Sequence, residues 1–201
     1  MSLDAHWYST IFGVYLFAGC AVAIYAGLVV LGLALQRSGV LVDAVTDEHY
    51  HDLGKLLFAF VVFWTYIAFS QFLLIWYANI PEETEWFAHR WVAGWRGTSV
   101  ALAAGHFGLP FFYLASRHVK RRRPALLVGA VWLLAMHLLD LYWLVMPGLH
   151  PESARPHLAD ALALLAVGGL WVGALGWLMR RPAMVPVRDP RLAESLSFEN
   201  L

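Results

Sequence analysis

Three ionisable side chains lie within long apolar stretches of the sequence. His106 lies near the middle of one stretch, and His137 and Asp140 lie together in the next. Their three-residue spacing puts His137 and Asp140 on one face of a helix. A buried carboxylate needs a partner, water or a proton, and His137 is one turn away. The pair is typical of a proton route inside a membrane, with His106 as a secondary candidate. The alternative is a hydrogen-bonded contact that only holds helices together.

Further polar groups lie in the stretch 56–78, which has no formally charged residue. Lipid cannot satisfy the hydrogen-bonding groups of Tyr66, Ser70 and Gln71, so these must face protein, water or a ligand. We take them as candidates for lining a polar cavity, together with Glu82 and Glu83 just beyond the stretch.

The two histidines also suggest a haem site. His106 and His137 fall near mid-depth of consecutive antiparallel stretches, as the two axial ligands of a haem b would. Small residues at 103–105 leave space beside His106, whereas the leucines around His137 crowd that side. Haem binding is therefore an alternative to the proton route. The sequence has a single cysteine, Cys20, which can form neither a zinc-thiolate site nor the C-x-x-C-H motif that attaches haem c. No metal site is expected.

Five apolar blocks carry these residues. The sequence is 60% hydrophobic and 14% charged, which excludes a soluble globular domain. Each block is long enough to cross the membrane as a helix, and none alternates as barrel strands do. The predicted fold is an all-α polytopic bundle of five transmembrane helices, in a domain 1–182 followed by a cytoplasmic tail 183–201. The predicted spans are 11–35, 56–78, 97–116, 125–146 and 161–179.

Charge placement predicts the orientation. Eleven of the 14 Lys and Arg residues fall in the loop 36–55, the loop 117–124 and the tail. Short loops rich in Lys and Arg stay in the cytoplasm, so the N-terminus is expected outside and the C-terminus inside. The basic loop is a topology signal with some attraction for anionic lipid, and we expect no nucleic-acid binding.

Two loops are longer than the others. The residues 36–55 carry His49 and His51 among acidic residues, and without metal-ligand spacing we expect a solvated face there. In Pro81–Arg96, Phe87, Trp91 and Trp95 recur every four residues, which predicts a short amphipathic helix on the outer membrane surface.

Four segments in order resemble one family. They are SLDAHWYSTIFGVYLFAG from Ser2, the segment His51–Glu83, HFGLPFFYLASRHVKRR from His106, and HLLDLYWLVMP from His137. Over about residues 2–182 the chain resembles the second quinone-binding-type membrane subunit of alternative complex III, which is related to the polysulfide reductase (NrfD-like) membrane subunits.

The resemblance implies a subunit of a respiratory quinol:cytochrome c-type oxidoreductase in the bacterial cytoplasmic (inner) membrane. The cavity candidates above then become candidates for contacts with quinone or menaquinone. The implied partners are a larger paralogous membrane subunit, an iron–sulfur protein and a multihaem cytochrome c. Those partners hold the haem c and iron–sulfur clusters, and this chain is expected to bind no cofactor of its own and to be inactive alone.

Family members carry about as many transmembrane helices again upstream, so this chain is expected to match the C-terminal half of a full-length member. Two other functions stay open, a haem b-binding membrane anchor and a small secondary transporter. The transporter is disfavoured because the five blocks lack the paired Gly/Pro-interrupted helices of inverted repeats.

Overall fold

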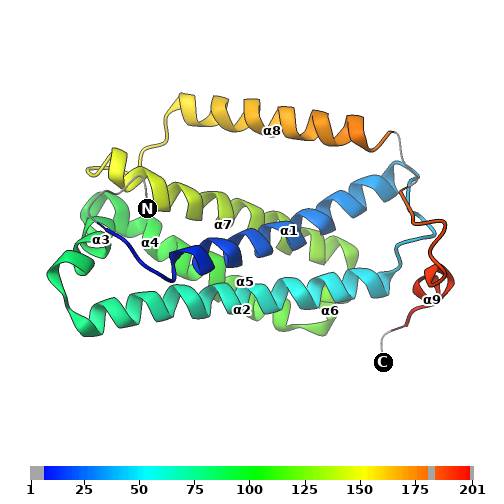
Figure 1. Ribbon diagram of the computed structural model, residues 1–201, viewed down its shortest axis with the longest axis horizontal. Helices are drawn as coiled ribbons and strands as arrows, with labels where there is room; N and C mark the ends of the chain where they lie inside the picture. The colour runs from blue at the N-terminus through cyan, green and yellow to red at the C-terminus, as the bar shows by residue number, and fades with distance from the viewer. Residues whose placement is uncertain (1–6, 181–183, 200–201) are drawn as a thin grey trace.

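Figure 1 shows the computed structural model, which describes residues 7–180 and 184–199. Four long helices are continuous: α1 (Phe12–Arg37), α2 (Asp47–Ala78), α7 (Arg123–Leu149) and α8 (Leu158–Leu178). The third apolar stretch is divided into α4 (Ala93–Leu102), the π-helix η1 (Ala103–Gly108) and α5 (Leu109–Ala115). The short helices are α3 (Pro81–Trp91), α6 (Arg117–Arg121) and α9 (Leu192–Leu196).

The prediction of an all-α chain with five long apolar helices is confirmed. Five helical segments among the described residues are long and apolar enough to cross a membrane. The domain boundary expected at residue 182 lies outside the described residues.

The core forms where α1 packs along both α2 and α7. The face of α1 that enters the core carries small residues at helical spacing, Ala18, Val22 and Ala26, all fully buried. Small side chains let helix backbones approach closely, which is how helices associate when lipid offers no hydrophobic drive. Larger residues of α2 and α7, among them Leu57 and Leu133, fill the space against this face.

The helix α8 stands apart. It lies alone beside α7 in Figure 1, and none of its Cα atoms comes within 8 Å of a Cα atom of another described helix. None of its residues is buried. The compact part of the molecule is therefore built from α1 to α7.

The helix α2 begins earlier than the predicted span. Its first residue is Asp47, and the Thr46 N–H donates to His49 Nδ1 (3.2 Å), which closes a capping box. Because α1 also extends to Arg37, more than half of the loop expected at 36–55 is thus helical. The expectation of a solvated face is wrong for His51, which is buried at 6% exposure.

The expected surface helix is shorter than Pro81–Arg96. Extended backbone at Val92 ends α3, and Trp95 belongs to α4, where it is fully buried and donates from Nε1 to the His150 carbonyl (3.0 Å). The residues that α3 buries are Trp86 and Arg90, whereas Trp91 is exposed. Phe87, Trp91 and Trp95 therefore do not share one face of a single helix, because Trp95 lies buried in the next helix.

The two ends of the bundle differ in chemistry. At one end, which we term the α3 end, α3 and the start of α4 pack against the last turns of α7. At the other, the α6 end, Lys120 donates to the Leu114 carbonyl (2.8 Å) and closes the end of α5. Burial, and the nearby Lys55, lower the pKa of the Lys120 ammonium.

Candidate functional site

A buried hydrogen bond joins α1 to α7 in the core. Tyr15 donates from its hydroxyl to an Asp140 carboxylate oxygen, across 125 residues of sequence. Asp140 is 1% exposed and Tyr15 is 6% exposed. The carboxylate predicted from the sequence to need a partner therefore has one, but that partner is a tyrosine of α1 and not His137, the partner that the sequence suggested.

His137 lies one turn before Asp140 and packs on a glycine of α1. A Cβ at Gly19 would lie 3.0 Å from Cε1 and 3.2 Å from Nδ1 of the His137 ring. The imidazole thus occupies the space that a side chain at position 19 would need. His137 is buried, and its Nδ1 has no hydrogen-bond partner among the described residues.

His106 belongs to the π-turn η1. The proline at 110 lacks the N–H that would bond the His106 carbonyl, and the wider π-turn accommodates this irregularity. Trp132 donates from Nε1 to the Gly105 carbonyl (2.8 Å), which satisfies a carbonyl of the same turn. The His106 ring is 1% exposed, and neither ring nitrogen has a partner in the described part of the chain.

Trp64 of α2 connects these groups. Its ring stands edge-on to the His106 ring with centroids 3.9 Å apart, and it is 5.5 Å from the Tyr15 ring. A Cβ at Gly19 would also lie 3.6 Å from Trp64 Cδ1, so Trp64 and His137 meet at the same point of α1. We term the five side chains Tyr15, Trp64, His106, His137 and Asp140 the polar core.

A large groove borders the polar core toward the α3 end. Its volume is about 1030 Å³, and it lies between α2, α3 and the broken helix α4–η1–α5. Half of its lining residues are aromatic, and six others are polar: Thr65, Gln71, Asn79, Thr84, Arg90 and Ser99. We term it the aromatic groove. Tyr15 and Trp64 belong both to its wall and to the polar core.

The residues predicted to line a polar cavity lie in different parts of the structure. Gln71 is buried in the groove wall, and Tyr66 lies at its rim with 66% of its surface exposed. Ser70 is partly buried outside the groove lining. Glu82 and Glu83 lie in the first turn of α3, where acidic residues favour the helix dipole, and they do not line the groove.

Arg90 is a buried residue that was not among the site residues predicted from the sequence. It donates to the Trp86 (2.9 Å), Trp143 (3.3 Å) and Leu144 (2.9 Å) carbonyls. Pro147 inside α7 has no N–H for the Trp143 carbonyl four residues earlier, so Arg90 supplies the missing donor. Its guanidinium also lies 3.5 Å from the Trp86 ring centroid. In the sequence, the spacing of four residues between Trp86 and Arg90 and the presence of Pro147 were the features that could have predicted this contact.

Packing argues against the haem alternative. Trp64 lies against the His106 ring and Gly19 against the His137 ring, so neither imidazole faces space for a porphyrin. The aromatic groove is lined by neither histidine. Among the described residues, no three His, Cys, Asp or Glu side chains gather as metal ligands.

The fold and the buried polar groups define an all-α, multi-pass membrane protein. Comparison of the sequence with protein-family models found no match, and comparison with curated proteins found none either.

Proposed function

We propose that the chain is a membrane subunit of a respiratory quinol oxidoreductase in the bacterial cytoplasmic membrane. In this proposal the aromatic groove receives the quinol head and the polar core takes up a proton. The single observation that carries it is the position of Tyr15, which lines the groove and donates a hydrogen bond to buried Asp140.

The groove suits a quinol by size and lining. An aromatic ring with an apolar tail needs a largely apolar site with a few polar groups that fix its orientation. The aromatic walls offer faces for stacking, and the Gln71 amide and the Tyr15 hydroxyl are polar groups on the inner wall. Exposed Tyr66, Phe69 and Phe72 at the rim place the opening on the outer surface of the bundle, where lipid-soluble molecules enter.

The chemistry asked of the chain is proton transfer. A quinol loses two electrons and two protons when it becomes a quinone. The Tyr15 oxygen can accept one hydroxyl proton while the Tyr15 proton passes to Asp140, so the carboxylate ends as a carboxylic acid. His137 and then His106 can extend the route, since both have buried nitrogens without a protein partner. The electrons leave to iron–sulfur or haem c centres, which we assign to partner subunits.

Orientation and partners are part of the proposal. If the α6 end is in the cytoplasm, as the basic loop favours, the groove opens near the outer face of the membrane. Protons from quinol would then be released on the side to which respiratory complexes deliver them. A larger paralogous membrane subunit, an iron–sulfur protein and a multihaem cytochrome c are the proposed partners, and the chain alone is not expected to turn over quinol.

The test removes the Tyr15 hydroxyl within the assembled complex. Tyr15→Phe should slow quinol oxidation at least tenfold, because general acid–base steps typically contribute 10²–10⁴-fold. The control is Tyr25→Phe, on the same helix, since Tyr25 stacks on Phe60 and lies outside the groove. Asp140→Asn should lower the rate or the number of protons released per electron.

Two outcomes would contradict the proposal. Wild-type turnover and proton yield in both Tyr15→Phe and Asp140→Asn would reduce this contact to a hydrogen bond that holds α1 and α7 together. If affinity purification of the tagged chain from its native membrane brings down no haem- or iron–sulfur-containing subunit, the assignment to a respiratory complex fails.

A further inference from the structure

A second, smaller pocket lies at the α6 end, far along α1 and α7 from the aromatic groove. Its volume is about 290 Å³, which is roughly ten times the share of one water molecule in the liquid. Its lining comes from the last turn of α1 and the first turn of α7: Leu33, Gln36, Arg37, Arg123, Pro124 and Leu127. We term it the two-arginine pocket.

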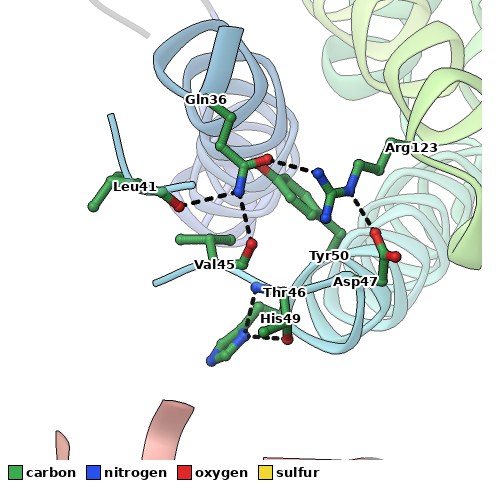
Figure 2. A network of polar contacts seen from close by, with 8 residues as sticks. All are labelled: Gln36, Leu41, Val45, Thr46, Asp47, His49, Tyr50 and Arg123. Carbon is green, nitrogen blue, oxygen red and sulfur yellow. Dashed lines mark hydrogen bonds and ion pairs between the residues drawn. The ribbon is translucent and has the colours of Figure 1, made fainter. Parts of the chain in front are cut away.

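One arginine of the pocket is held in place by its neighbours (Figure 2). Arg123 donates from Nη1 to Gln36 Oε1 (3.1 Å) and forms an ion pair with Asp47. Its guanidinium also lies 5.4 Å from the Tyr50 ring centroid. These contacts use only part of its five N–H donors, so donors are left for a ligand.

Gln36 is fixed as firmly. Its amide nitrogen donates to the Leu41 (3.2 Å) and Val45 (2.7 Å) carbonyls, and its oxygen accepts from the Tyr50 hydroxyl (3.1 Å). Because Gln36 is held on both sides, the pocket wall is organised before any ligand binds. Such preorganisation is what a specific site needs and what a loose cluster of basic side chains lacks.

The second arginine supplies charge. Arg37 ends α1 and is exposed, and no ion pair or hydrogen bond of its side chain is found among the described residues. Asp47 offsets the charge of Arg123, whereas no acidic side chain lines the pocket. The pocket therefore keeps a positive charge and favours an anion.

The apolar lining points to a lipid. Leu33 lies one turn before Arg37 on α1, and Leu127 lies one turn after Arg123 on α7. On both helices the charge is thus at the end of the span and the leucine one turn deeper. That order matches a phospholipid, whose phosphate lies at the interface above its hydrocarbon chains. A free phosphate ion would gain nothing from the two leucines.

We propose that the two-arginine pocket binds the phosphate of an anionic membrane phospholipid between α1 and α7. The bound lipid would bridge the two helices at the α6 end. This inference is independent of the quinol proposal, because the two sites share no lining residue.

The test measures phosphatidylglycerol binding to the full chain, purified in mild detergent with any subunits that remain bound. Native mass spectrometry counts bound lipid as phosphatidylglycerol is titrated, with phosphatidylcholine and inorganic phosphate in parallel. Arg37→Gln should weaken phosphatidylglycerol binding at least about fivefold, as expected for one basic residue at an anionic surface. Arg37 is preferred to Arg123 for the variant because its loss leaves the network of Figure 2 intact.

The control is Arg122→Gln, which removes an equal charge from an exposed side chain beside the pocket. Arg122→Gln should leave phosphatidylglycerol binding unchanged. Equal weakening in both variants would show a diffuse charge attraction of the basic loop and overturn the site. Equal affinity for phosphatidylcholine would overturn it as well, and phosphate binding that matches phosphatidylglycerol binding would identify a free anion and overturn the lipid.

Discussion

The contact between Gly19 and His137 offers a sharp test of how tightly the polar core is packed. In Gly19→Ala the new Cβ would lie 3.0 Å from His137 Cε1 and 3.6 Å from Trp64 Cδ1. Carbon atoms at their optimal separation are about 3.5–4.0 Å apart, so the imidazole must move by about 0.5 Å or more. Neighbours of the ring are buried, and Asp140 follows one turn later on the same helix.

A matched substitution on the same helix isolates the steric cost. A Cβ at Gly27 would meet nothing within 4 Å, so Gly27→Ala gains only helix propensity, up to ~1 kcal/mol. Gly19→Ala gains the same propensity but adds an overpacking cost of ~1–3 kcal/mol. The difference between the two variants is therefore ~1–3 kcal/mol, with propensity cancelled. At about 2–4 °C per kcal/mol for a chain of this size, Gly19→Ala should melt ~2–12 °C below Gly27→Ala.

The assay is thermal unfolding of both variants in the same detergent, repeated in a His137→Ala background. Removing the imidazole removes the atoms that the new methyl group meets, so the penalty of Gly19→Ala should shrink there by more than half. A Gly19→Ala variant that melts at or above Gly27→Ala would refute this packing of His137. So would an equal penalty with and without the imidazole.

Three further predictions test other parts of the molecule. Arg90→Gln should lower the free energy of unfolding by ~2–4 kcal/mol, because buried carbonyl groups lose their donor. The control Arg96→Gln, at an exposed position, should change it by less than ~0.5 kcal/mol. Both are measured by thermal unfolding in detergent. Truncation after residue 156, which removes α8 and the tail, should shift the melting temperature of the remaining chain by less than ~2 °C, since α8 buries none of its residues and its backbone lies apart from the other described helices. A large loss would show that α8 stabilises the bundle. Membrane-impermeant thiol labelling of Ser116→Cys and Thr84→Cys, each in a Cys20→Ser background, should mark opposite sides of the membrane, and labelling of both from one side would contradict the proposed orientation.

The long helices could be predicted from the sequence because each is set by a local property. A run of about 20 apolar residues must satisfy its backbone internally in lipid, and only a helix does so within one segment. The ends of the helices were harder to predict. Polar residues from Asp47 to Lys55 gave no reason to continue α2 outward, and the capping contact between Thr46 and His49 that starts the helix depends on its geometry.

The candidate site was predicted in part. Asp140, His137 and His106 could be found because an ionisable group in an apolar stretch is conspicuous in the sequence alone. Tyr15 could not, since a tyrosine among aromatic residues at one end of a span is common and its partner is 125 residues away. Gly19 gave equally little signal, although its spacing of four from Tyr15 puts both on one face of α1. Contacts between distant helices depend on their rotation about their own axes, which apolar composition leaves undetermined.

The irregular backbone of the molecule gathers around the same region as its buried polar groups. His106 lies within the π-turn of the third span, and Pro147 removes a backbone donor from α7 seven residues after Asp140. Each irregularity frees carbonyl groups that lipid cannot satisfy, and each is repaired by a side chain from another element, Trp132 in one case and Arg90 in the other. This kind of hydrogen bond restricts how the helices can pack, because the donor side chain and the freed carbonyl group belong to two different elements. The restriction is understandable if these turns hold a ligand site next to a proton route. Tyr15 lies where the two would meet.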